Sequence, residues 1–275
     1  MVFSIIGGDE RMLFLAERLI DCGHKVRLCG FEKHERHIPC VSAGDALFGA
    51  DCVILPLPST KDGRTVWTPY GEQEIYLADM VSAAGRKTLF LTANATLGAE
   101  REKDYFAREE LTVLNAVPTV EGALQVALTN TDRTLWRARC LVAGFGRIGR
   151  LLCHRLSSFG CGISATSRRP ETESWIEAYG YDCIRNTALA DRVGEFDIIF
   201  NTVPESIFTE EILSKVKKDC VLIELASPPY GIDFQAAKRL GLRALLASGL
   251  PAKTAPKTAA DIIFDTISNI LSEQF

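Results

Sequence analysis

Three glycines near the middle of the chain have the spacing of a nucleotide-binding loop. Gly144, Gly146 and Gly149 form the pattern G-x-G-x-x-G. In such a loop the first glycine allows a sharp turn, the second lets a pyrophosphate approach the backbone, and the third lets a helix pack closely. The apolar run 140–143 precedes the pattern and a helix-period segment, 148–159, follows it, so the strand-to-helix context is present. The alternative is a tight turn without a ligand.

The residues that follow the next predicted strand indicate which dinucleotide binds. NAD-binding domains usually carry an acid about 20 residues beyond the glycines, where it binds the ribose hydroxyls. This sequence has Ser167, Arg168 and Arg169 at that point and no acid. Guanidinium groups form bidentate, charged hydrogen bonds with phosphate. We therefore predict NADP as the cofactor, with NAD as the alternative; a solvated basic turn would also explain the arginines.

Two further strand ends belong to the same predicted crevice, because ligands of doubly wound sheets bind at the carboxyl ends of the strands. The segments 201–204 and 226–229 end the fourth and fifth predicted strands of this half, although ordinary strand-ending turns would look similar. The predicted cofactor-binding residues are Gly144, Phe145, Gly146, Arg147, Ile148, Gly149, Ser167, Arg168, Arg169, Asn201, Thr202, Val203, Pro204 and Ala226.

Short β-rich runs alternate with helix-period segments along the chain, which predicts the α/β class with parallel sheets. The strands expected in the first half are 2–6, 25–29, 52–56, 88–91 and 111–114, with helices over 10–22, 71–84 and 99–108. The strands expected in the second half are 140–143, 162–166, 182–184, 197–201, 221–224 and 242–245, with helices over 148–159, 172–179, 209–216 and 234–240.

These elements predict two domains. An N-terminal flavodoxin-like or Rossmann-like α/β domain on the substrate side covers 1–118, and a doubly wound NAD(P)-binding Rossmann domain covers 119–275. The second range includes a linking helix over 119–137, capped by Thr119, and a return helix over 258–273, which begins at Thr258 and Asp261. The apolar face of the return helix is expected to pack back across the first domain.

Composition excludes several partner classes. The chain has 275 residues, 47% of them hydrophobic, and a formal net charge of −4, so there is no basic face for nucleic acid or an anionic membrane surface. No apolar run reaches the roughly 20 residues of a membrane span, and residues 1–8 resemble a buried strand more than a secretion signal. We expect a cytoplasmic protein. The nine cysteines are scattered singly without metal-ligand spacing, which predicts no metal site.

The domain order resembles that of the D-2-hydroxy acid dehydrogenases and adenosylhomocysteinase. The dehydrogenases use an arginine after the fifth Rossmann strand and a histidine after the sixth, whereas this chain has Ala226-Ser227 and 248–250 there. Its histidines are His24, His34, His37 and His154, and we expect His34 and His37 to be solvated in a polar loop. Histidine-driven alcohol oxidation is therefore disfavoured. The catalytic residues remain unknown.

Several dispersed motifs are similar to the dipicolinate synthase A-subunit family. They lie at 5–11, 30–32, 56–59, 118–123 and 249–259, and so extend over essentially the whole chain. Ala252 stands where that family usually has glycine, but Lys253 is retained. The resemblance implies NADP-dependent oxidation of dihydrodipicolinate, derived from the lysine pathway, to pyridine-2,6-dicarboxylate in the mother cell of a sporulating bacterium. It also implies a second chain of dipicolinate synthase, the flavoprotein-like B-subunit.

A dicarboxylate substrate requires two anion sites. The candidates are Arg11, Ser59, Thr60, Lys253 and Lys257, in loops that we expect near the interdomain cleft, although surface or capping roles fit each of them. Two alternatives stay open for function: another NAD(P)-dependent dehydrogenase or reductase of small carboxylates, and a non-catalytic NADP-binding subunit that partners a flavoprotein-like chain. A homo-oligomer is compatible with the sequence.

Overall fold

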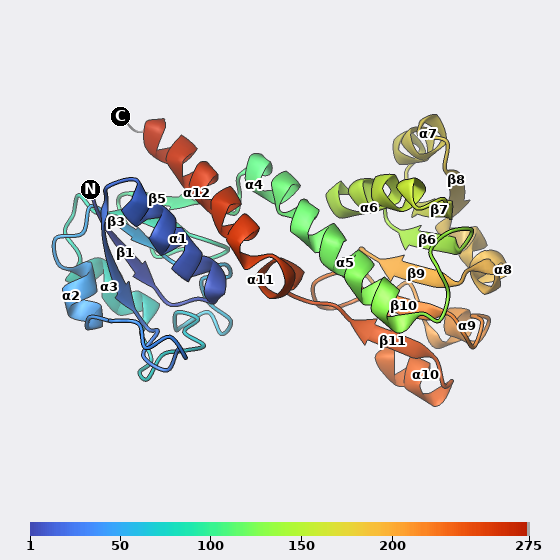
Figure 1. The fold of residues 1–275 in the computed structure, drawn as a ribbon, viewed down its shortest axis with the longest axis horizontal. Coiled ribbons are helices and arrows are strands. Elements are labelled where there is room, and N and C mark those ends of the chain that lie inside the picture. The colour runs from blue at the N-terminus through green and yellow to red at the C-terminus, as the bar shows by residue number, and fades with distance from the viewer. Residues whose placement is uncertain (274–275) are drawn as a thin grey trace. The chain divides into compact units, whose positions relative to one another are not determined.

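The computed structural model describes residues 1–273, which fold into two compact units (Figure 1). The first unit comprises Met1–Asn115 and the described residues from Ala255 onward, and the second comprises Ala116–Thr254. Each unit has a parallel sheet with helices on both faces. The predicted α/β class, with a Rossmann-like sheet in each half, is confirmed.

The first unit is built on a five-stranded sheet of order β2-β1-β3-β4-β5, the flavodoxin-like arrangement. Its strands are β1 (Val2–Ile6), β2 (Lys25–Cys29), β3 (Cys52–Ile54), β4 (Leu89–Thr92) and β5 (Glu102–Asp104). Its helices are α1 (Glu10–Asp21), α2 (Ala43–Leu47), α3 (Leu77–Ala83), α4 (Glu109–Leu114) and α12 (Pro256–Ser272).

The alternation of side chains along β1 assigns the two faces of this sheet. Phe3 and Ile5 are fully buried in the cluster that contains α1 and α12. Ser4 and Ile6 point to the other face, where the Ser4 hydroxyl donates to the Ala46 carbonyl of α2 at 2.5 Å. A strand buried on both faces reads as a continuous apolar run, as residues 2–6 do.

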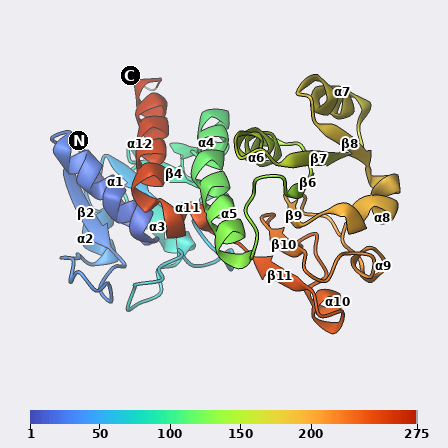
Figure 2. The same cartoon turned by 45° about the vertical axis from the view of Figure 1, so that its right-hand side comes forward.

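Helix α12 lies along α1 in Figures 1 and 2 and completes the core of the first unit. Ile263, Ile267 and Ile270 of α12 are buried against the α1 side chains. The predicted division at 118/119 counted this helix with the second domain because of its place in the chain, but its apolar face packs within the first unit. The helix begins at Pro256 after the N-cap Ala255, so Thr258 and Asp261 lie inside it and do not cap it.

We expect Ile267→Ala to destabilise the first unit by about 2–5 kcal/mol, because it removes a fully buried side chain and leaves a cavity. Urea unfolding followed by circular dichroism measures this change. Asp265→Ala, on the exposed face of the same helix, is the control and is expected to change stability by less than about 0.5 kcal/mol. Equal, small effects of both substitutions would contradict the packing of α12.

The second unit is a doubly wound domain with six strands in the order β11-β10-β9-β6-β7-β8 (Figure 2). Its strands are β6 (Arg139–Ala143), β7 (Gly162–Ser167), β8 (Asp182–Arg185), β9 (Ile198–Asn201), β10 (Val221–Glu224) and β11 (Arg243–Leu246). Its α-helices are α5 (Ala116–Asn130), α6 (Arg147–Ser158), α7 (Pro170–Ala178), α8 (Leu189–Arg192), α9 (Glu210–Leu213), α10 (Phe234–Arg239) and α11 (Leu250–Thr254).

Residues along β6 alternate between the two cores of this unit. Cys140 and Val142 pack with α5, α6 and α7, whereas Leu141 and Ala143 pack with the helices on the opposite face. The linking helix is α5, which starts earlier than predicted and ends at Asn130 rather than at residue 137. Thr119 is therefore inside α5 and does not cap it.

The structure corrects the prediction at the end of the first sheet. Residues 99–108, expected as a helix, contain the edge strand β5, which pairs with β4. Residues 111–114, expected as a strand, belong to α4, where only Leu111 is buried. A charged edge strand such as Glu102–Asp104 resembles an exposed helical turn in composition, and periodicity cannot distinguish segments this short.

The segment Glu109–Asn130, which contains α4 and α5, is long and apolar enough to span a membrane by length and composition alone. The most apolar window of this segment is 44% buried inside the protein. Val120, Ala123 and Ala127 of α5 are fully buried and form part of the second unit's core. Core helices satisfy the same criterion, and this one has protein contacts to match.

Candidate functional site

The glycine loop, residues 144–149, joins β6 to α6 with the geometry of a phosphate-binding turn. Gly144 has φ +93°, in the region that favours glycine. A Cβ on Gly144 would lie 2.6 Å from the Thr202 hydroxyl, and one on Gly149 would lie 2.2 Å from the Gly144 carbonyl oxygen. Both positions therefore require glycine for the chain to close around the loop.

Gly146 differs from these two glycines because it faces open space. A Cβ built on Gly146 meets no atom within 4 Å, and this residue is the N-cap of the 12-residue helix α6. It has no side chain to accept hydrogen bonds from the first-turn N–H groups of α6. An exposed helix N-terminus with this opening in front of it fits an anionic pyrophosphate.

The first unit has a comparable pair of glycines after its own first strand, but that space is filled. Gly7 and Gly8 have φ of +74° and +101°. A Cβ on Gly7 would lie 2.7 Å from the Trp67 carbonyl oxygen and 2.8 Å from the Thr68 methyl group, and the Gly8 N–H donates to that same carbonyl at 2.9 Å. The segment containing Trp67 thus occupies the place of a phosphate, and only the second unit offers an open loop.

Phe145 and Arg150 show how the glycine loop is held from one side. The Phe145 ring is buried and packs edge-on against Tyr179 and Tyr181, with ring centroids 6.0 and 6.3 Å away. Arg150 stacks on Phe145 and on Trp175, and its Nε donates to the Phe145 carbonyl at 3.2 Å. Phe145 therefore offers a ligand its backbone rather than its ring. Arg147 is exposed and Ile148 is half-buried at the start of α6.

The end of β7 adjoins the glycine loop. The Thr166 hydroxyl accepts a hydrogen bond from the Gly144 N–H at 3.1 Å. The buried Ser167 hydroxyl accepts from the Arg169 N–H at 3.1 Å, which shapes the turn. Arg168 and Arg169 are both exposed, and the Arg168 guanidinium lies 2.6 Å from the carboxylate of Glu205. This basic turn is therefore open to solvent and shielded only by a surface carboxylate.

The ends of β9 and β10 interlock beside the loop. The Thr202 hydroxyl donates to the Ala143 carbonyl at 2.8 Å, so the segment 201–205 rests on the glycine loop. Asn201 is fully buried and donates from its amide to the Glu224 carboxylate at 2.7 Å. Val203 and Pro204 follow in the same turn, and the buried Ala226 begins the loop after β10. Sequence reasoning missed Glu224, for which the only signal was one acid ending an apolar strand.

Three of the predicted substrate ligands lie in the first unit, and two of them are engaged by its own structure. The buried Arg11 guanidinium pairs with Asp9 at 2.8 Å and donates to the Leu57 carbonyl at 2.5 Å. The fully buried Ser59 hydroxyl donates to the Pro56 carbonyl and accepts from the Ala93 N–H. Thr60 is half-buried and its hydroxyl donates to Asp62, which also caps the following turn.

Asp62 organises this turn through several N–H and O–H donors. Hydrogen bonds from the backbone N–H groups of Thr65 and Arg64 hold the pKa of the Asp62 carboxyl well below its usual range. Lys253 of α11 and Lys257 of α12 are exposed, and neither forms an ion pair with another residue in the described range 1–273. These two lysines are the predicted ligands that remain available to an anion.

His34 contradicts the expectation of a solvated histidine. Only 5% of it is exposed, its ring packs edge-on against Tyr70 at 4.7 Å, and its Nε2 contacts the Glu10 carboxylate. Burial and the nearby Glu10 charge raise the pKa of Tyr70. The surrounding residues looked polar in sequence, but the chain folds back over α1 here. His37 is exposed as predicted.

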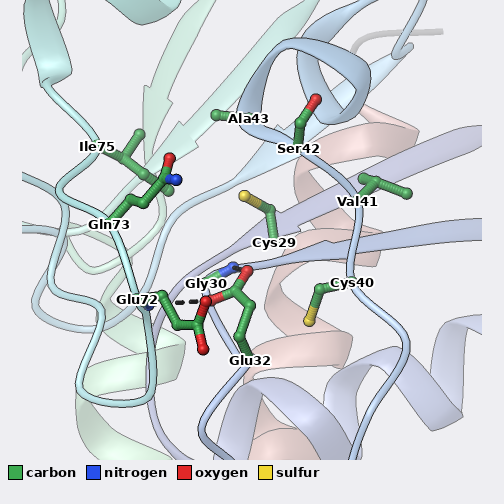
Figure 3. A pocket seen from close by; sticks show the side chains of 10 residues that line it. All are labelled: Cys29, Gly30, Glu32, Cys40, Val41, Ser42, Ala43, Glu72, Gln73 and Ile75. Carbon is green, nitrogen blue, oxygen red and sulfur yellow. Dashed lines mark hydrogen bonds between the residues drawn. The ribbon is translucent and has the colours of Figure 1, made fainter.

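A separate pocket of about 250 Å³ lies at the end of β2 in the first unit (Figure 3). Cys29 and Cys40 line it, and burial raises the pKa of Cys29 to about 12, so that thiol stays protonated. The Glu32 carboxylate accepts from the Gly30 and Glu72 N–H groups, as Figure 3 shows for Glu72. No group of three or more metal-ligating side chains occurs within the described residues.

The comparisons with known proteins follow the same division of the chain. Residues 2–113 match the N-terminal domain of the dipicolinate synthase A-subunit, and residues 120–228 match the NAD binding domain of D-isomer specific 2-hydroxyacid dehydrogenase. The dipicolinate synthase A-subunit of Bacillus subtilis (strain 168) is 29% identical over 283 residues, covering 98% of this chain and 95% of the relative. The chain belongs to the dipicolinate synthase A-subunit family.

Solved structures of the dipicolinate synthase A-subunit family agree with this assignment. The structure from Bacillus subtilis has a TM-score of 0.87 at 28% identity and covers 99% of this chain and 96% of its own. The one from Bacillus halodurans has a TM-score of 0.86 at 26% identity, with 98% and 97% covered. A Sinorhizobium meliloti transhydrogenase, with a TM-score of 0.70 at 18% identity, shares the fold alone.

The dehydrogenase match defines the general chemistry of the second unit in this family member. It is an oxidoreductase-type domain that binds a nicotinamide cofactor. The open glycine loop, the helix N-terminus behind it and the basic turn after β7 fit such a cofactor, since each provides a group that a dinucleotide requires.

Proposed function

We propose that this chain is the NADP-dependent dehydrogenase component of dipicolinate synthase, which oxidises dihydrodipicolinate to dipicolinate. The observation that carries the proposal is the open glycine loop at Gly146, in a chain that aligns over 98% of its length with the dipicolinate synthase A-subunit of Bacillus subtilis. The nicotinamide accepts one hydride from the substrate ring, which also loses one proton and becomes aromatic. Aromatisation lowers the demand for a strong base.

The residues of the second unit have distinct roles in this proposal. The N–H groups at Gly146, Arg147 and Ile148 bind the pyrophosphate, with Gly144 and Gly149 shaping the turn. Ser167, Arg168 and Arg169 bind the 2′-phosphate through charged hydrogen bonds. The strand ends at Asn201, Thr202, Val203, Pro204 and Ala226 flank the nicotinamide half.

Basic side chains are the proposed ligands of the substrate carboxylates. Lys253 and Lys257 are the first choices because they are exposed and make no ion pair with another described residue. Arg11 and Thr60 are secondary because their polar groups already have partners, and the Ser59 hydroxyl is buried with both a donor and an acceptor. Replacing Lys253 or Lys257 by Met is expected to raise KM for the dicarboxylate more than it lowers kcat.

We further infer that the chain works with the flavoprotein-like B-subunit in the cytoplasm of the mother cell of a sporulating bacterium, on a product of the lysine pathway. The naming of its relatives as one of the subunits of a synthase supports a partner chain.

The direct test incubates the purified chain with dihydrodipicolinate and NADP, with and without the B-subunit. The expected result is near-ultraviolet absorbance of dipicolinate together with one equivalent of NADPH. Oxidation of a small 2-hydroxy acid instead would favour the rival dehydrogenase. Tight NADPH binding without turnover, even with the B-subunit present, would favour a non-catalytic nucleotide-binding component. Either outcome overturns the proposal.

A further inference from the structure

Glu224, at the carboxyl end of β10, has a fully buried carboxylate surrounded by N–H donors. One oxygen accepts from the Asn201 amide at 2.7 Å and from the Ala226 N–H at 2.9 Å. The other accepts from the Gly231 and Ile232 N–H groups at 2.8 and 3.0 Å. None of the surface of Glu224 is exposed. Four donors converge on two oxygens, which saturates the carboxylate.

This arrangement indicates that Glu224 carries its negative charge. An ionised carboxylate only accepts hydrogen bonds, and all four partners are N–H donors. A protonated carboxyl would direct its own O–H at one of these donors. Within residues 1–273 no lysine, arginine or histidine forms an ion pair with Glu224. The charge is therefore stabilised by amide dipoles alone and is not neutralised by a cation.

The surrounding backbone also fixes the position of this charge. A Cβ on Gly231 would lie 2.4 Å from the Asn201 amide nitrogen and 2.9 Å from the Glu205 carbonyl oxygen. The loops after β9 and β10 therefore close tightly around the carboxylate. Both loops lie at the carboxyl ends of β9 and β10, in the half of a doubly wound sheet that takes the nicotinamide nucleotide.

We infer that Glu224 makes the second unit favour the oxidised nicotinamide over the reduced one. The oxidised ring carries a positive charge and the reduced ring is neutral, so a fixed anion beneath the crevice stabilises only the oxidised form. The inference rests on the nicotinamide-binding role of this unit. It deepens the proposed function, because a dehydrogenase that prefers NADP to NADPH takes up its substrate form and releases its product form.

The test compares dissociation constants for NADP and NADPH in Glu224→Gln and the unaltered chain, by calorimetry without substrate. We expect the ratio Kd(NADP)/Kd(NADPH) to rise on the order of tenfold in the variant, the scale of one charge acting at an effective dielectric constant of about 20. Glu211→Gln, an exposed acid on α9, should leave the ratio unchanged.

A second pair of variants separates charge from packing, since the glutamine amide meets N–H donors and can prevent folding. Glu224→Asp and Glu224→Asn share one smaller shape and differ in charge. The ratio is expected to stay near that of the unaltered chain with aspartate and to rise with asparagine. Equal ratios in both variants would refute the role of Glu224 even though both nucleotides bind. If the unaltered chain binds neither nucleotide, nicotinamide binding itself is refuted.

Discussion

Gly146→Ala is expected to weaken NADP binding on the order of 100-fold while leaving the fold intact. The added methyl group meets no protein atom within 4 Å, so it costs no packing energy. It enters the space that the proposed pyrophosphate site needs at the start of α6. Calorimetric titration gives the affinity, and thermal unfolding without nucleotide gives the stability. Affinity equal to that of the unaltered chain would contradict the assignment of the pyrophosphate site.

Gly149→Ala provides the matched contrast within the same loop. Its Cβ would lie 2.2 Å from the Gly144 carbonyl oxygen, which is backbone and cannot move without opening the turn. We expect this variant to lose both affinity and stability. Gly44→Ala, on an exposed helical turn with no contact closer than 3.9 Å, controls for the effect of the substitution itself.

The double variant Arg168→Ala/Arg169→Ala is expected to weaken NADP on the order of 100-fold and to change NAD by less than about threefold. Only NADP has the 2′-phosphate, and each charged hydrogen bond contributes about 1.5–3 kcal/mol. Because both side chains are exposed, the substitution should leave the melting temperature nearly unchanged. Equal losses for both nucleotides would place the 2′-phosphate elsewhere.

Glu205 offers an independent check of the same assignment. Its carboxylate lies 2.6 Å from the Arg168 guanidinium, so it competes with any phosphate that binds there. Glu205→Gln should tighten NADP by about two- to fivefold, the range of an exposed ion pair, and leave NAD unchanged. Weaker NAD binding would instead mean that Glu205 serves the ribose hydroxyls as an acid supplied from another strand.

The second unit was predicted from sequence more accurately than the first. Its glycines, apolar strands and helix starts agree locally, and all six strands form close to where periodicity indicates. The first unit ends in short segments such as Glu102–Asp104, whose strand pairing depends on β4 and not on their own composition. Long-range pairing leaves little trace in a three-residue window.

The details of the site depend on contacts between distant residues. Sequence identified the glycine loop and the basic turn because each is a contiguous motif. It could not show that Arg168 meets Glu205, that Asn201 meets Glu224, or that His34 is buried against Tyr70. The same limit explains Ser59 and Arg11, whose side chains looked available to a substrate but complete backbone hydrogen bonds of their own domain.

The filled loop of the first unit determines how many nucleotides one chain can hold. Both units have a glycine turn after a first strand, but Trp67 and Thr68 stand where a phosphate would enter beside Gly7. Titration should therefore saturate at one equivalent of nucleotide per chain, and excess nucleotide should not act as a competitive inhibitor at the first unit. The duplicated architecture leaves one half dedicated to the cofactor and frees the other from it.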